Sequence, residues 1–164
     1  MIRKIHFVFL LISIHSLSQE NLSDLLKKYN TESVPYISSD SLKLILNDVL
    51  LFDAREKVEF ETSHIKNALF VGYDKFNLEK TNTKIPNKND KIIVYCSLGI
   101  RSSTIAIKLK KAGYTNVLNL YGGIFEWKNS GYRVYNRDEK ETEKVHTYKQ
   151  EWSKWLLKGE KKYE

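Results

Sequence analysis

Short apolar runs, separated by stretches with helical spacing, limit most strongly how this chain can fold. Four such runs are four or five residues long and lie at 49–52, 68–71, 91–95 and 117–120. A continuous apolar run of this length suits a strand that is buried on both faces, as in a parallel sheet covered by helices. Because the runs alternate with helical patterns, the sequence predicts an α/β domain with a mainly parallel central sheet flanked by helices.

Helical patterns lie before and between these runs. Helices are expected over 22–29, around 42–46, over 102–112 and in a short stretch ending near Trp127, with a further brief strand at 34–37. Asn21 or Ser23 would cap the first helix, because their side chains accept hydrogen bonds from the free N–H groups of a first turn. Gly113 would end the helix over 102–112.

The N-terminal segment has the pattern of a secretory signal. Arg3 and Lys4 precede an apolar stretch at 5–14, and small residues at Ser16 and Ser18 suit a signal peptidase. We therefore expect residues 1–18 to be removed and the protein to be exported, to the periplasm or the medium. The alternative is an uncleaved N-terminal anchor. After cleavage no apolar stretch approaches the roughly 20 residues that span a bilayer.

The C-terminal segment is rich in charges of both signs and also contains an aromatic stripe. Five of its apolar residues recur at spacings of three and four, which predicts one face of a helix: Val145, Tyr148, Trp152, Trp155 and Leu156. We expect this stripe to dock on the domain. The alternative is a surface that binds a protein partner or a membrane surface.

Composition excludes several kinds of site. The chain has one cysteine, which rules out an internal disulfide framework and a four-cysteine zinc site. Its net charge of +7 is interspersed, and two of the positive charges, Arg3 and Lys4, lie in the N-terminal segment. The sequence has no glycine-rich nucleotide loop, no cluster of metal ligands and no basic-aromatic patch. We therefore expect no cofactor, no metal and no nucleic-acid partner.

The single cysteine lies where chemistry is expected. Cys96 follows the predicted strand at 91–95, and ligands bind at such carboxyl ends of strands in open α/β sheets. Gly99 permits a tight turn that points backbone N–H groups into a common cradle, and the following helix presents its positive end. Arg101 adds a guanidinium fork that suits an oxyanion or a persulfide. The alternative is a cysteine that is buried only for packing.

Several motifs in order resemble the rhodanese family of sulfurtransferases. They are DAREKVEF at 53–60, HIKNA at 64–68, IIVYCSLGIRSS at 92–103, the Gly113-Tyr114 pair and VLNLYGGIFEW at 117–127. Ser63 and Asn67 depart from the pattern, because the family usually has glycine at these positions. Asparagine tolerates left-handed backbone angles, which makes the change at Asn67 easy to accept.

The resemblance implies a three-layer rhodanese-like domain and a division of the chain. Its parts would be a signal peptide at 1–18, a helical segment at 19–33, the domain at 34–136 and a charged, aromatic extension at 137–164. It also implies that Asp53 and Arg55 shape the site from beneath. The alternative for Arg55 and His64 is a purely structural role, in which each side chain pairs with a neighbouring group. For His64 we favour this structural role over proton transfer.

The resemblance further implies covalent sulfur transfer. Cys96 would take the outer sulfur of thiosulfate or a persulfide and pass it from a Cys96 persulfide to cyanide or a thiol. The surrounding loop would hold the persulfide charge, and its members are Ser97, Leu98, Gly99, Ile100, Arg101 and Ser102. Ser102 would also cap the helix. Ser97 and Leu98 are uncharged, so neither supplies a cation that selects thiosulfate.

Two other functions remain open from the sequence. The domain would be a sulfur carrier or a protein-binding module if it meets a protein partner instead of turning over small molecules. The aromatic stripe at 148–155 would then be a docking face. Cysteine phosphatases use a similar cradle, but they need a longer loop than the four residues between Cys96 and Arg101. The short loop favours a single sulfur atom over a phosphate group.

Overall fold

A computed structural model gives the structure, and it describes residues 21–31, 34–83, 85 and 87–163. The expected signal peptide at 1–18 lies outside the described residues. Within them no helix is long and apolar enough to cross a membrane.

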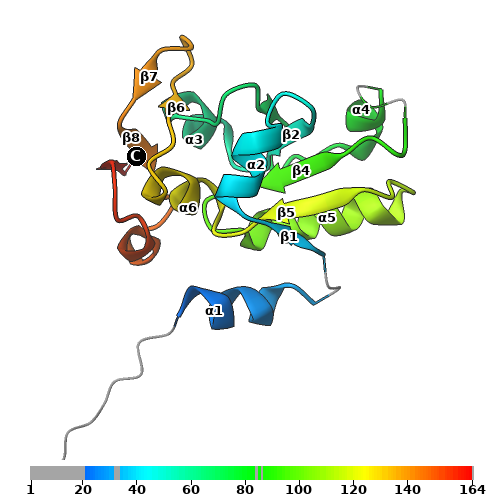
Figure 1. Cartoon of the computed structure of the whole chain (residues 1–164), viewed down its shortest axis with the longest axis horizontal. Helices are drawn as coiled ribbons and strands as arrows, with labels where there is room; N and C mark the ends of the chain where they lie inside the picture. Colours follow the sequence, from blue (N-terminus) through cyan, green and yellow to red (C-terminus); the bar gives the residue numbers. More distant parts are fainter. Residues whose placement is uncertain (1–20, 32–33, 84, 86, 164) are drawn as a thin grey trace, which may run out of the picture.

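A five-stranded parallel sheet forms the centre of the domain (Figure 1). Its strand order is β1-β5-β4-β2-β3, and the bounds are β1 Tyr36–Ile37, β2 Leu50–Asp53, β3 Leu69–Phe70, β4 Ile92–Tyr95 and β5 Val117–Leu120. Every residue of β4 is buried, as expected for a central strand covered on both faces. The prediction of a mainly parallel sheet is confirmed.

Six α-helices accompany the described part of the sheet: α1 Leu22–Tyr29, α2 Ser39–Ile45, α3 Lys57–Thr62, α4 Leu78–Asn82, α5 Ile100–Lys111 and α6 Gly123–Asn129. Asn21 caps α1 and Ser38 caps α2, each by accepting a backbone N–H. The helix expected to start at residue 102 begins two residues earlier, at Ile100.

Two apolar cores lie on opposite faces of the sheet. Ile93 and Tyr95 belong to one core, while Ile92 and Val94 belong to the other. This separation follows from the pleat, since successive side chains of a strand point to opposite faces. Helices α2 and α6 contribute side chains to the first core, and α5 contributes side chains to the second. Helices therefore cover both faces of the sheet and complete a three-layer α/β domain, as the resemblance implied.

The strand expected at 68–71 is shorter than predicted. Only Leu69 and Phe70 form β3, which pairs with β2 at the edge of the sheet. Both residues are more than a third exposed, at 38% and 37%. An edge strand has one open side, so its apolar run does not need to be covered on both faces.

The C-terminal segment is not one helix, so the sequence prediction there is wrong. It forms β8 Lys144–His146, a short 3-10 helix η1 Gln150–Trp155 and β9 Glu160–Lys162, which pairs with β8 in parallel. Tyr148 and Gly159 have left-handed φ angles of 65° and 97°, which a continuous helix does not permit.

The same segment nevertheless packs on the domain, as expected. Val145 and Leu156 are buried, and Trp152 and Trp155 pack against the same core. Before it, β6 Val134–Tyr135 pairs antiparallel with β7 Glu141–Thr142. Figure 1 shows these strands and the C-terminus beside α6 and α3, at the end of the sheet toward which the β4 arrow points.

Candidate active site

Cys96 follows β4 directly and is completely buried. The backbone N–H of Gly99 donates to its Sγ at 3.1 Å, and the Ser102 Oγ lies 3.5 Å from the same atom. Gly99 has a φ of 111°, so the expected positive φ at this glycine is confirmed. The loop thus turns tightly around the sulfur and directs a backbone donor at it.

Arg101 binds the protein rather than leaving its guanidinium fork open. Its two terminal nitrogens donate to the two carboxylate oxygens of Glu59, each at 2.7 Å, and Nη2 also reaches the Ser97 Oγ at 3.0 Å. Among the described residues the buried Nε of Arg101 has no partner. This nitrogen is therefore the donor that Arg101 retains for a bound anion.

Each charge in the Glu59–Arg101 pair stabilises the other. Burial alone would lower the pKa of Arg101, but hydrogen bonding to Glu59 and the charges of Cys96 and Glu59 raise it. Burial alone would raise the pKa of Glu59, yet its hydrogen bonds to Arg101 and the charges of Arg55 and Arg101 lower it. The two groups therefore remain an ion pair beside the Cys96 loop.

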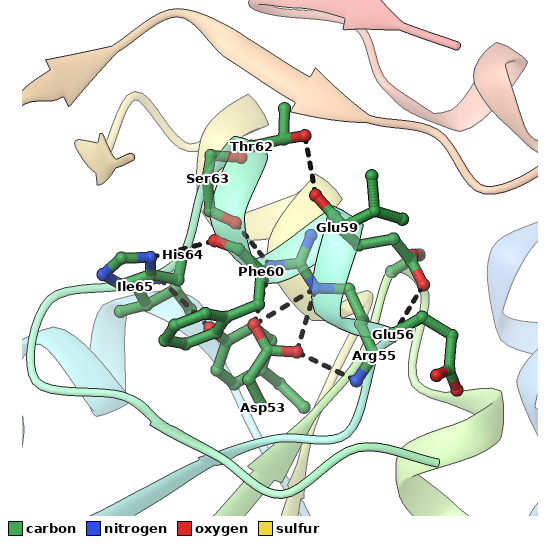
Figure 2. Close-up of polar contacts among 12 residues, drawn as sticks. Asp53, Arg55, Glu56, Glu59, Phe60, Thr62, Ser63, His64 and Ile65 are labelled. Atoms are coloured by element: carbon green, nitrogen blue, oxygen red, sulfur yellow. Dashed lines mark hydrogen bonds and ion pairs between the residues drawn. The ribbon is translucent and has the colours of Figure 1, made fainter. Parts of the chain in front are cut away.

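Asp53 and Arg55 form a second buried ion pair (Figure 2). Arg55 donates to both oxygens of Asp53, with a shortest distance of 2.6 Å, and to the carbonyl of Ser63 at 2.6 Å. Burial would lower the pKa of Arg55, but the charge of Asp53 raises it overall. This pair ties the end of β2 to the end of α3, the helix that carries Glu59.

The glycine-to-asparagine and glycine-to-serine departures are both accommodated. Asn67 has a φ of 65°, so its expected left-handed conformation is confirmed. Ser63 ends α3 with a φ of −167°, which is ordinary extended backbone. The backbone therefore tolerates both changes, and the buried Ser63 Oγ has no hydrogen-bond partner among the described residues.

Ser102 does not cap α5, which corrects the sequence prediction. The N-cap is Gly99, and Ser102 lies inside the first turn. Its Oγ donates to the Asn119 side chain at 2.8 Å, and the Asn119 amide donates to the Gly99 carbonyl at 2.7 Å. Asn119 on β5 thus binds the loop at its middle, Gly99, and at its end, Ser102. The one sequence signal for this role was a polar residue inside an apolar run.

Helix α6 closes the loop from another side. The N–H groups of Ile124 and Phe125 donate to the carbonyls of Cys96 and Ser97 at 2.9 and 3.2 Å. A side chain on Gly123 would overlap both carbonyls, which explains the need for glycine at this position. The carbonyls therefore point toward α6 and away from the cradle around the sulfur.

The remaining loop and flanking residues have mainly structural contacts. Ser97 donates from its Oγ to Glu59 at 3.1 Å, Leu98 lies in the apolar core, and Ile100 is half-buried. His64 uses both ring nitrogens on other groups, the Phe60 carbonyl and the Glu139 carboxylate, each at 3.0 Å (Figure 2 shows the first contact). The expected structural pairing of His64 is therefore present. Within the described residues no group of three or more His, Cys, Asp or Glu side chains could hold a metal ion.

The chain is similar to known proteins over its central part. The family model "Rhodanese-like domain" matches residues 38–130. A tRNA uridine(34) hydroxylase of Aster yellows witches'-broom phytoplasma (strain AYWB) is 34% identical over 116 residues, which cover 68% of this chain and 37% of that protein. The thiosulfate sulfurtransferase GlpE of Coxiella burnetii (strain RSA 331 / Henzerling II) is 35% identical over 81 residues, covering 49% of this chain and 73% of that protein.

A solved structure shows the same likeness. The rhodanese-related protein of Thermoplasma volcanium superposes with a TM-score of 0.53 at 26% identity, over 61% of this chain and 96% of that one. The matched region contains Cys96, both buried ion pairs and the loop between β4 and α5. Since the family model covers more than half of the sequence, the protein belongs to the rhodanese-like family.

Proposed function

We propose that the protein is a sulfurtransferase that carries a sulfane sulfur on Cys96. The observation that supports this most directly is the Cys96 Sγ, which lies at the carboxyl end of β4 and accepts the Gly99 N–H at 3.1 Å. A sulfur atom that receives a backbone donor in a tight loop is suited to bearing negative charge, as a thiolate or as the terminal sulfur of a persulfide.

The first step consumes a donor such as thiosulfate. The Cys96 thiolate attacks the outer sulfur and forms an S–S bond, while the bond between this sulfur and the sulfonate sulfur breaks. Its electron pair leaves with sulfite, so the enzyme becomes a Cys96 persulfide with one negative charge. A low-molecular-weight persulfide donor would react in the same way and release a thiolate.

The second step restores the enzyme. Cyanide or a thiolate attacks the terminal sulfur of the persulfide and forms thiocyanate or a new persulfide, and the electron pair of the broken S–S bond returns to Cys96. The backbone cradle around Gly99 supports the charge in both steps, and the free Nε of Arg101 offers a further donor.

Intact mass spectrometry after mixing with thiosulfate tests this proposal. Wild-type protein is expected to gain one sulfur atom and to lose it when cyanide is added, whereas Cys96→Ser gains none. Because Cys96 is the sole cysteine, the adduct needs no further mapping. Absence of an adduct with both thiosulfate and a low-molecular-weight persulfide would contradict the proposal. Cys96-dependent hydrolysis of an aryl phosphate by a protein that takes no sulfur from thiosulfate would contradict it as well.

A sulfur-carrier role is the second candidate, favoured by the complete burial of Cys96. A carrier would accept sulfur once and release it only to a protein partner. Steady-state thiocyanate formation separates the two: a sulfurtransferase makes many equivalents per protein molecule, and a carrier makes about one.

We also propose that the protein acts after export, in the periplasm or the medium, because residues 1–18 have the charge and hydropathy pattern of a signal peptide. Expression of the full chain in a bacterial host, followed by fractionation and N-terminal sequencing, tests this. Cleavage after about Ser18 supports it, and retention of residues 1–18 in the membrane fraction contradicts it.

A further inference from the structure

The side chain of Tyr148 brings the C-terminal segment, residues 144–163, to the candidate active site. The ring centre of Tyr148 lies 4.1 Å from the guanidinium carbon of Arg101, within cation–π distance. Of the groups that contact this guanidinium, Glu59 and Ser97 are buried, whereas Tyr148 is 40% exposed. Tyr148 therefore lies between Arg101 and the solvent.

The conformation of Tyr148 is specified by its surroundings. Its φ of 65° is in the left-handed region that residues with a side chain rarely adopt, and its N–H donates to the His146 Nδ1 at 3.0 Å. Its ring also packs against Trp152, with ring centres 5.3 Å apart. Such strained residues persist only where the surrounding structure holds them, and they are frequent at ligand clamps.

Access to Cys96 requires that a covering group moves, because its side chain is completely buried. Leu26 of α1 covers another part of the loop, 3.4 Å from the position that a side chain on Gly99 would occupy. Leu26 is itself 1% exposed, so its movement would expose apolar surface to water. Tyr148, which covers the Arg101 guanidinium, is 40% exposed, so its movement loses less packing than movement of Leu26.

Space for a larger molecule lies outside Tyr148. An open hollow of about 620 Å³ is lined by Tyr148, Lys149, Gln150, Glu151 and Tyr163. Tyr148 lines this hollow and also contacts the guanidinium of Arg101, which is not among the residues that line it. A bulky sulfur donor in the hollow therefore meets the Tyr148 ring before it meets the Cys96 loop.

We propose that Tyr148 is a specificity-determining residue that admits small inorganic sulfur donors to Cys96 and restricts bulky organic ones. The inference rests on the proposed function, because it concerns which donors that reaction accepts. The ring limits the width of the approach while it keeps the guanidinium of Arg101 covered. A small anion needs only a partial displacement of the ring, whereas an aryl donor needs its removal.

Three variants test the proposal with thiosulfate and benzenethiosulfonate as donors. In Tyr148→Ala the ratio of kcat/KM for benzenethiosulfonate to that for thiosulfate is expected to rise about tenfold, a change typical of reshaping a binding pocket. Tyr148→Phe keeps the ring and should keep the ratio. Tyr29→Ala removes a similarly exposed tyrosine, 45% exposed, from α1 and outside the hollow, and should also keep the ratio.

A further variant without the ring, Tyr148→Gly, separates the loss of the ring from a loss of stability. Tyr148→Gly removes the ring and also relieves the left-handed strain, so its thermal unfolding midpoint should not fall below that of Tyr148→Ala. It should raise the donor ratio by a similar factor. The proposal is overturned if the donor ratio is unchanged in Tyr148→Ala and Tyr148→Gly. It is also overturned if kcat/KM changes by the same factor for both donors.

Alkylation of Cys96 supplies a readout that does not depend on sulfur transfer. Intact mass spectrometry follows modification by iodoacetamide and by a bulky N-aryl maleimide. Tyr148→Ala should accelerate the maleimide about tenfold more than iodoacetamide, again as for a widened pocket. Equal acceleration overturns the role of Tyr148. A wild-type protein that takes sulfur from neither donor overturns the proposed function instead, and the alkylation ratio then decides on Tyr148 alone.

Discussion

The two buried ion pairs of this domain have similar chemistry and different positions. Asp53–Arg55 joins residues two positions apart and is fully buried, and Arg55 also donates to the Ser63 carbonyl. Glu59–Arg101 joins residues 42 positions apart, links α3 to α5 and lies beside Cys96 and the half-exposed Tyr148. One pair is thus enclosed within the protein, while the other contacts Ser97 of the Cys96 loop and the partly exposed Tyr148.

The two positions predict different consequences for stability and for the proposed sulfur transfer. The inner pair fixes the chain between β2 and α3, so it determines where Glu59 stands. The outer pair fixes the fork of Arg101 beside the Cys96 loop. Each arginine has one buried nitrogen without a partner in the described part of the chain, Nη1 in Arg55 and Nε in Arg101. Breaking the inner pair should therefore affect folding most, and breaking the outer pair should affect sulfur transfer as well.

Removing Arg55 is the largest test of this comparison. In Arg55→Met the Asp53 carboxylate loses its partner inside the protein, and breaking a fully buried pair in this way typically costs about 3–5 kcal/mol. The free energy of unfolding, from urea denaturation, should fall by that amount.

Arg133→Met is the matched control, since Arg133 makes an ion pair with Glu141 on the surface with 71% of its side chain exposed. It should change the free energy of unfolding by no more than about 0.5 kcal/mol. Equal effects of the two substitutions would show that the Asp53–Arg55 pair does not support the fold.

Neutralising Glu59 should have a smaller effect on stability and a visible effect on activity. Glu59→Gln keeps the shape but loses the charge that binds both terminal nitrogens of Arg101. Hydrogen bonds between charged groups contribute about 1.5–3 kcal/mol, so stability should fall within that range. Arg101 is no longer fixed, and the rate of Cys96 persulfide formation from thiosulfate should fall.

Glu61→Gln controls for this substitution on the same helix. Glu61 is 37% exposed and pairs with Lys57 at 3.7 Å, away from Arg101. Both stability and persulfide formation should remain near wild type in this variant. If Glu59→Gln loses stability but forms persulfide at the wild-type rate, the outer pair would be structural like the inner one.

The sequence allowed prediction of the parts of the site that are contiguous along the chain. Cys96, Gly99 and Arg101 lie in one loop, and the positive φ of Gly99 follows from the tight turn that such a loop requires. The parallel sheet was also predictable, because each buried strand carries its own apolar run. Local pattern is sufficient where the contacts are local.

Partners that come from other elements could not be predicted in this way. Glu59 meets Arg101, and Asn119 meets Ser102, only because the strand order brings their elements together. The helix prediction for the C-terminal segment was wrong for another reason. Apolar residues at spacings of three and four share one face of a helix, but a turn at Tyr148 with a strand on either side buries the same residues. Hydrophobic spacing therefore predicts which residues are buried more reliably than it predicts the path of the backbone.

The smallest effect that distinguishes the two pairs is a dependence of stability on pH. Although burial raises the pKa of Glu59, its hydrogen bonds to Arg101 and the nearby positive charges lower it below the ordinary value of 4.5. A carboxyl group whose pKa is lowered on folding contributes stability that is complete above its unfolded pKa and is lost as the pH falls through its folded pKa. Urea denaturation of wild type and Glu59→Gln between pH 7 and pH 3 should therefore show a gap that is constant near neutrality and narrows below about pH 4.5. A gap that stays constant to pH 3 would mean that Glu59 binds its proton equally in the folded and unfolded chains, and that the bond to Arg101 does not stabilise its charge.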